Sequence, residues 1–179
     1  MPYPSKLPLP ASATASTVLR TQPGIYEYRA WENISVGVWV GQATREAVVG
    51  IYDIMREMNE RHPNGHSSVV FILDQLPAPT AEAQQEFTKL FSAPAEHMYS
   101  AVVLEGSGFW ASGLRAMIRN AHDASNGAMH IRIGTTVDEI MQWFPEVHEK
   151  ATGRALHPRL TRHALLQIRE TGEANARSV

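Results

Sequence analysis

The chain has 179 residues, of which 44% are hydrophobic, which fits a single globular domain with terminal extensions. Its formal net charge is −2, and residues of both signs are intermixed along the chain. The charge gives no electrostatic basis for binding nucleic acid or an anionic membrane, and no apolar run is long enough to span a bilayer, so we expect a cytoplasmic protein. The absence of cysteine excludes disulfides, thiolate nucleophiles and cysteine-bound metal.

The first segment is rich in proline, serine, alanine and threonine. We predict that residues 1–24 form a disordered N-terminal arm that ends at Pro23-Gly24. The prolines interrupt every apolar stretch of the arm, which argues against a signal peptide. Four apolar residues could dock on a second copy of the chain, so a homodimer is a further expectation. These residues are Leu7, Leu9, Val18 and Leu19.

An antiparallel hairpin is predicted next. Residues 25–30 alternate between apolar and charged side chains, and residues 35–41 form a second apolar segment after a short turn. Thr44 is a good N-cap residue for the helix that follows, whose apolar residues recur at helical spacing. Pro63-Asn64-Gly65 ends that helix.

Three short apolar runs, at residues 69–73, 101–104 and 129–133, are each followed by a stretch of helical periodicity. This alternation predicts an α/β domain over residues 25–150, with a parallel or mixed sheet and about four covering helices. In the last of these helices, Thr136 and Glu139 form a capping-box pattern, and Pro145 interrupts or ends the helix.

Residues 151–179 differ from the preceding domain. We predict a C-terminal extension with one short basic helix that begins at His157-Pro158, and residues from Thr171 onward carry no core pattern.

The carboxyl ends of the buried strands are the expected place for a functional site. Asp74 ends one strand, where a carboxylate either serves a function or accepts N–H groups of the following loop. Residues 105–108, Glu-Gly-Ser-Gly, lie between a strand and a helix as phosphate-binding loops do. However, Glu105 would repel phosphate and the acidic residue of a dinucleotide fingerprint is missing, so we expect no cofactor.

Two further kinds of catalytic site are disfavoured. Ser107 has glycines as immediate neighbours, whereas a nucleophile elbow needs them two residues away on either side. His62 and His66 have helical spacing, but Pro63 and Gly65 between them exclude a helical metal pair, so no metal site is expected. We therefore expect no enzymatic activity. The alternative is a small-ligand binder or an enzyme with its site near Asp74 and Gly106.

The order of elements, two strands followed by alternating helices and strands, resembles the STAS domain of anti-sigma-factor antagonists. Three segments are similar to bacterial STAS-like proteins: residues 71–74 (Phe-Ile-Leu-Asp), residues 108–110 (Gly-Phe-Trp) before a helix carrying Arg115 and Arg119, and residues 136–143. The resemblance covers residues 25–147.

The resemblance implies a non-catalytic regulatory signalling module that binds a protein partner. It also implies a phosphorylated hydroxyl where the loop after the Asp-ended strand enters its helix, and Thr80 is the hydroxyl residue there. Because ends of adjacent parallel strands meet at one edge, we expect a single partner-binding face. Its expected residues are Asp74, Pro77, Pro79, Thr80, Phe109 and Trp110.

Overall fold

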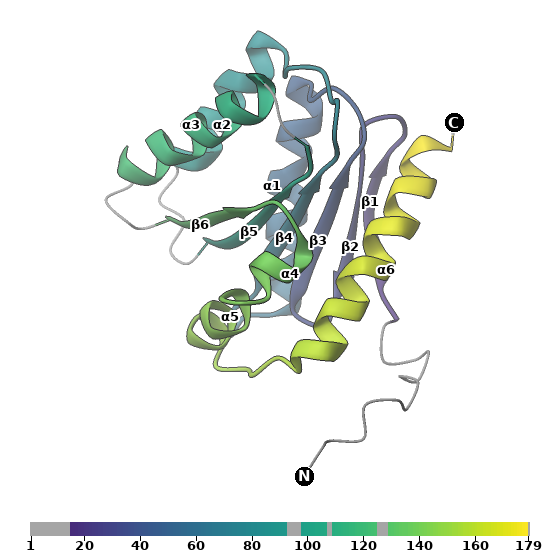
Figure 1. Cartoon of the computed structure of the whole chain (residues 1–179), viewed down its shortest axis with the longest axis vertical. Helices are drawn as coiled ribbons and strands as arrows, with labels where there is room; N and C mark the ends of the chain where they lie inside the picture. Colours follow the sequence, from purple (N-terminus) through teal and green to yellow (C-terminus); the bar gives the residue numbers. More distant parts are fainter. Residues whose placement is uncertain (1–14, 93–97, 107–108, 125–128, 179) are drawn as a thin grey trace.

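Residues 15–92, 98–106, 109–124 and 129–178 are described by a computed structural model of the chain (Figure 1). Six strands and six helices are found among these residues. The strands are β1 (Thr17–Gln22), β2 (Tyr26–Trp31), β3 (Ile34–Trp39), β4 (Ser67–Ile72), β5 (Met98–Leu104) and β6 (Met129–Gly134). The helices are α1 (Arg45–Arg61), α2 (Ala81–Ser92), α3 (Phe109–Ala124), α4 (Val137–Ile140), α5 (Phe144–Thr152) and α6 (Pro158–Arg177).

All six strands belong to one sheet, in which their order across the sheet is their order along the chain. β1 pairs antiparallel with β2, and β2 pairs antiparallel with β3. The pairs from β3 to β6 are all parallel. The protein is therefore an α/β domain with a mixed sheet. The predicted α/β class and the predicted hairpin are both confirmed.

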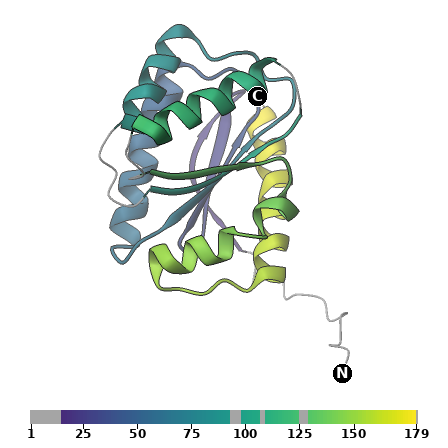
Figure 2. The same ribbon diagram turned by 60° about the vertical axis from the view of Figure 1, so that its left-hand side comes forward.

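Helices cover both faces of the sheet (Figure 2). The helices α1, α2 and α3 connect successive parallel strands and lie on one face. When successive parallel strands are added in the same direction across a sheet and every connection is right-handed, the connecting helices all lie on the same side of the sheet. The opposite face is covered by α4, α5 and α6, which follow the last strand.

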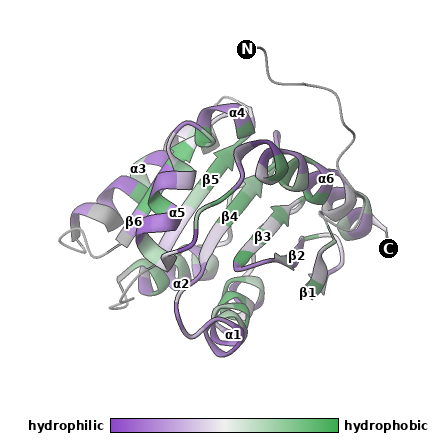
Figure 3. Cartoon of the chain, turned by 90° about the horizontal axis from the view of Figure 1, so that it is seen from below, coloured by the Kyte–Doolittle hydropathy of each residue, from purple (hydrophilic) through white to green (hydrophobic). Residues whose placement is uncertain are grey.

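Each face of the sheet has its own hydrophobic core because side chains alternate along every strand. On β3, Val36 and Val38 belong to the core beneath α4–α6, whereas Trp39 belongs to the core beneath α1 and α2. Phe71 and Phe144 are fully buried in the core beneath α4–α6. Figure 3 shows hydrophobic residues concentrated on the central strands.

The N-terminal boundary of the domain differs from the prediction. Residues 17–22 form the edge strand β1, so the prediction of a disordered arm as far as residue 24 is wrong for this segment. Most side chains of β1 are exposed and the strand contains Arg20 and several other polar residues, which explains why no buried run reveals it. Residues 1–14, including Leu7 and Leu9, lie outside the described residues.

The C-terminal boundary differs as well. The predicted short helix of an extension is the 20-residue helix α6, which packs on β2 and β3. Leu165, Ile168 and Ala176 are buried in the core of the domain. At Gly172 an added Cβ would lie 2.8 Å from Val38 Cγ2, so this small residue lets the helix approach the sheet closely. The segment is thus an integral part of the domain.

The segment after β6 contains two helices instead of one. Thr136 caps the single turn α4 by accepting a hydrogen bond from the Glu139 amide at 3.1 Å, which agrees with the predicted capping-box pattern. Pro145 lies in the first turn of α5, where its missing N–H is tolerated. The described residues therefore form six helices, where four covering helices and one C-terminal helix were expected, because Pro145 begins a separate helix.

Candidate functional site

The carboxyl ends of β4 and β5 bring Asp74 and Gly106 together, as the sequence predicted. Gly106 has a φ of +89°, and a Cβ added there would lie 1.9 Å from Asp74 Oδ1. The same oxygen accepts a hydrogen bond from the Gln75 amide at 2.9 Å. Asp74 itself is exposed to solvent. The carboxylate therefore packs on the backbone of the neighbouring turn while one side remains accessible.

Backbone and cap interactions hold the loop from Asp74 to Thr80 in place. Gln42 Nε2 donates to the Ala78 carbonyl at 2.8 Å, and the Thr80 amide donates to the Ala43 carbonyl at 3.0 Å. Thr80 Oγ1 accepts a hydrogen bond from the Ala83 amide at 3.1 Å, which caps α2. The loop is thus tied both to the segment before α1 and to its own helix.

The predicted partner-binding residues differ in accessibility. Asp74 and Pro77 are exposed, and Thr80 is half-buried with its hydroxyl engaged in the cap. Pro79 is buried, so its assignment to an exposed contact face is wrong, and its carbonyl accepts a hydrogen bond from Gln84 Nε2 at 3.2 Å. The helix α3 begins at Phe109, but the side chains of Phe109 and Trp110 lie outside the described part of the chain, as do residues 107–108.

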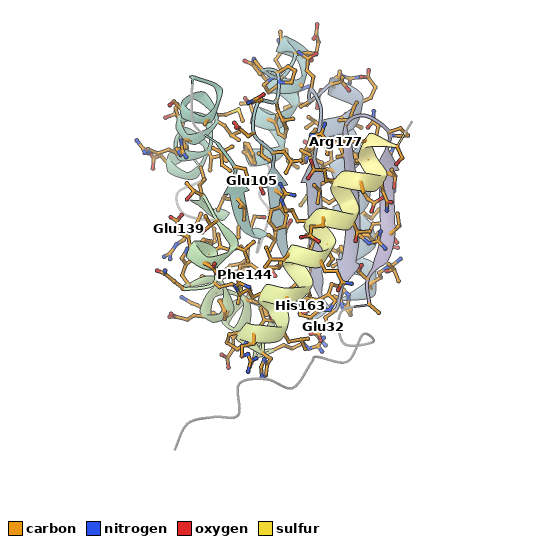
Figure 4. The ribbon with its side chains drawn as sticks, turned by 45° about the vertical axis from the view of Figure 1, so that its right-hand side comes forward. Glu32, Glu105, Glu139, Phe144, His163 and Arg177 are labelled. Carbon is orange, nitrogen blue, oxygen red and sulfur yellow. The ribbon has the colours of Figure 1, made fainter. Side chains whose placement is uncertain are left out.

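An ion-pair network connects the carboxyl end of β5 to the helix α6. Two nitrogens of the Arg169 guanidinium group, Nε and Nη2, each lie 2.6 Å from a carboxylate oxygen of Glu105. The third nitrogen, Nη1, lies 2.7 Å from Glu173 Oε2. The hydrogen bonds that Arg169 donates to Glu105 raise the pKa of Arg169 above its usual range. Figure 4 shows Glu105 beside the upper half of α6. Glu105 thus binds α6, a role that the sequence did not reveal because its partner is 64 residues away.

A cavity of about 320 Å³ lies between the sheet and the helices α1, α2 and α3. Apolar and aromatic side chains form most of its wall, among them Trp39, Ile54, Phe87 and Ile118. Pro77 of the Asp74–Thr80 loop also lines it. Asp74 and Gly106 are not among its lining residues, so the ligand site predicted as an alternative, next to these two residues, does not coincide with the cavity.

Three serines on adjacent strands line one end of this cavity. Ser35 of β3 pairs in register with Ser68 of β4, which pairs with Ser100 of β5. Ser35 is 5% exposed and Ser100 is 7% exposed. None of the three hydroxyl groups is among the fully buried polar atoms that lack a hydrogen-bond partner, whereas Nδ1 of His66, which also lines the cavity, is one of them. Sequence reasoning missed this row because it depends on the register between strands more than 30 residues apart.

His66 and Asn59 complete this polar end of the cavity. His66 Nε2 lies 3.0 Å from Asn59 Oδ1, and Asn59 is exposed to solvent. Burial and the nearby His62 lower the pKa of His66, which favours its neutral form. The polar end therefore lies beside solvent and carries no charged carboxylate, lysine or arginine among its lining residues.

A serine and a histidine also meet on the opposite face of the sheet. Ser67 Oγ and His148 Nδ1 are 2.7 Å apart, but the two residues are only 1% and 0% exposed. Burial, with a smaller effect of Arg154, lowers the pKa of His148 to about 4. A nucleophile must reach its substrate, and this serine is enclosed by the core, so we assign the pair a structural role.

A comparison with protein-family models finds no match for this chain, and a comparison with curated proteins finds no matching sequence. Within the described ranges, no group of three or more histidine, cysteine, aspartate or glutamate residues is arranged to hold a metal ion. No helix in the described part of the chain is both long and apolar enough to cross a membrane.

Proposed function

We propose that the protein is a non-catalytic regulatory module that binds a protein partner through the edge formed by the carboxyl ends of β4 and β5. The exposed residues Asp74, Gln75, Pro77, Ala78 and Gly106 form this surface, which we call the Asp74 face. Phe109 and Trp110, which the sequence assigns to this face, stand at the start of α3. The proposal agrees with the STAS-like resemblance of the sequence.

The observation that carries this proposal is the conformation of Gln75. Its φ is +63°, in the left-handed region that residues other than glycine and asparagine rarely adopt. Such strain costs about 1–3 kcal/mol and is retained where the surroundings fix the backbone, often at functional sites. Here the strained residue is exposed and lies beside the exposed acid Asp74, in a loop fixed by hydrogen bonds.

A rigid exposed loop suits protein recognition because little conformational freedom is lost on binding. Two prolines, Pro77 and Pro79, restrict the backbone of the loop, and the contact from Gln42 to Ala78 fixes its outer part. Asp74 adds a negative charge that favours a partner with a basic contact surface.

Thr80 is the proposed regulatory position of this face. A phosphate on its oxygen would lie at the N-terminus of α2, where backbone N–H groups and the helix dipole favour negative charge. The present acceptor role of Oγ1 toward the Ala83 amide is a role that phosphate oxygens can also fill. Phosphorylation would therefore add charge to the Asp74 face without removing the helix cap.

Affinity capture followed by binding measurements on purified components tests the proposal. The wild-type chain and Asp74→Lys are used as baits, and Glu60→Lys is the matched control, since it makes the same charge change on the exposed C-terminal turn of α1. A partner retained by the wild type and by Glu60→Lys, and bound at least about tenfold more weakly by Asp74→Lys, supports the proposal.

Thermal unfolding of each variant accompanies the binding measurement, so that a loss of binding through misfolding is recognised. If every captured protein binds Asp74→Lys as tightly as the wild type, the Asp74 face is not the contact surface. A turnover of substrate that disappears in Asp74→Ala would overturn the non-catalytic assignment.

A further inference from the structure

The cavity beneath α1, α2 and α3 is much larger than ordinary packing defects. Protein interiors are close-packed, and voids larger than a water molecule are few. A water molecule occupies about 30 Å³ in the liquid, so 320 Å³ has room for on the order of ten heavy atoms. The space is also partly open to solvent, so a molecule could enter it, unlike an enclosed packing void. Its walls offer water few hydrogen-bond partners, so water is a poor occupant of its apolar part.

The serine row shows that one end of the cavity is built differently from the rest. Two residues further along β4 and β5, on the same face of the sheet, the residues are Val70 and Val102. These valines line the cavity as well, so the wall changes from hydroxyl groups to methyl groups within two residues along β4 and β5. A serine hydroxyl can both donate and accept hydrogen bonds. At the same end, the buried Nδ1 of His66 has no hydrogen-bond partner, and such an unsatisfied group costs about 1–3 kcal/mol. The row therefore offers several hydrogen bonds to a molecule that enters from the end near Asn59.

The charge of the lining restricts the class of molecule. No lysine, arginine, aspartate or glutamate lines the cavity within the described residues, and the pKa of His66 is lowered. A carboxylate or an ammonium group at the serine row would lose part of its hydration without gaining a counter-charge from the described lining residues, which is unfavourable. A hydroxyl, ketone or amide group can pair with serine hydroxyls at no such penalty.

We propose that the cavity is a binding site for an uncharged, largely apolar small molecule whose single polar group hydrogen-bonds to Ser35, Ser68 and Ser100. The apolar part of the molecule extends between Ile54, Phe87 and Ile118. The polar group lies at the end of the cavity that is next to solvent. This site is distinct from the Asp74 face, although Pro77 belongs to both.

The probe for this proposal is 1-octanol, compared with octanoate at a pH at which octanoate is fully ionised. Both have the same alkyl chain, so a difference in affinity reports the polar group. Calorimetric titration and thermal unfolding measure binding. We expect 1-octanol to bind and to raise the unfolding temperature, and octanoate to bind at least about tenfold more weakly. Absence of octanol binding, or tighter binding of octanoate, would overturn the proposal.

Two pairs of variants locate the site. Ser68→Ala removes the central hydroxyl and should weaken octanol binding about fivefold, which corresponds to one net hydrogen bond. Ser112→Ala, on the exposed surface of α3, is its control and should bind as the wild type does. Val70→Phe fills the cavity and should abolish binding, whereas Val49→Phe, at a position that is 38% exposed on α1, should not. Equal binding by Ser68→Ala and the wild type would refute the role of the serine row.

A measurement on the wild-type chain keeps the proposal testable if Val70→Phe does not fold. Nuclear Overhauser effects between the alkyl protons of octanol and the methyl groups of Val102 and Ile118 are expected, because both residues line the cavity. Contacts to methyl groups outside the lining, with none to these two residues, would place octanol elsewhere and contradict the proposal.

Discussion

The carboxylate of Asp74 occupies the space that a side chain at position 106 would need. An added Cβ on Gly106 would lie 1.9 Å from Asp74 Oδ1, and the φ of +89° at this glycine is itself unfavourable for any other residue. Parallel pairing of β4 and β5 produces this relationship, since it places the residues after both strands at the same edge. The Asp74 face therefore depends on a glycine in the turn that follows β5.

Replacement of Gly106 tests this dependence. We expect Gly106→Ala to lower the free energy of unfolding by about 1–3 kcal/mol through backbone strain and the clash with Asp74. Chemical denaturation measures the change. Gly113→Ala is the matched control. Gly113 lies in α3, and apart from its own helix backbone and chain neighbours, no atom of the described residues lies within 4 Å of the place its new methyl group would take. The change should be neutral or stabilising by up to about 1 kcal/mol. Adding Asp74→Ala to Gly106→Ala should restore part of the lost stability.

Two substitutions of Thr80, the residue that caps α2, distinguish the effect of the cap on stability from the effect of an added charge. Thr80→Ala removes the acceptor of the Ala83 amide and should cost about 1 kcal/mol of stability. Thr80→Asp keeps an N-cap acceptor and adds a negative charge, so its unfolding free energy should stay close to that of the wild type. If Thr80 regulates the Asp74 face, Thr80→Asp changes partner affinity although its stability is unchanged. Equal affinity of Thr80→Asp and the wild type would contradict a charge-based switch.

The pair of Glu105 and Arg169 should contribute more to stability than a typical surface ion pair. Both side chains are about one quarter exposed and they form two parallel hydrogen bonds. We expect a coupling free energy of about 1–2 kcal/mol in a double-mutant cycle with Glu105→Gln and Arg169→Met. The control cycle uses Asp138 and Arg162, which are 66% and 48% exposed, and should give at most about 0.5 kcal/mol. Similar values for both cycles would show that burial does not strengthen the first pair.

The parts of the fold that could be predicted from sequence are those with a strong local signal. The apolar run at residues 69–73 is buried between two layers, and Asp74 follows directly from the end of that run. The position of Gly106 beside Asp74 followed from the parallel arrangement alone. β1 escaped prediction because an edge strand with exposed side chains has no hydrophobic pattern.

The remaining features depend on contacts between distant residues. The last turns of α6 contact the sheet through small residues such as Gly172 and Ala176, and small residues give a weak helical pattern. The serine row exists only because β3, β4 and β5 pair in one particular register. The role of Glu105 as a partner of Arg169 likewise requires the position of α6. None of these relationships is encoded in a local stretch of sequence.

The buried histidine His148 should make the fold sensitive to acid. Its pKa is lowered from 6.5 to about 4 in the folded chain, chiefly by burial. Between these values the unfolded chain binds a proton at this residue and the folded chain does not, so the unfolded state gains stability as the pH falls. The contribution is fully present above pH 6.5 and is lost progressively as the pH falls toward 4, amounting to about 3 kcal/mol.

Chemical denaturation of the wild type and of His148→Gln over this pH range measures that contribution. The variant should be less stable at neutral pH, because glutamine replaces a fully buried ring that bonds to Ser67, but it should lose less stability on acidification. Other groups with lowered pKa values, such as His66 and Asp138, are present in both chains and cancel in the difference. His163→Gln, on the exposed side of α6, is the matched control, and on acidification it should lose as much unfolding free energy as the wild type does. If the curves of His148→Gln and the wild type run parallel from neutral pH to the acid limit, His148 has the same pKa in the folded and the unfolded chain, and its burial does not have the effect assigned to it.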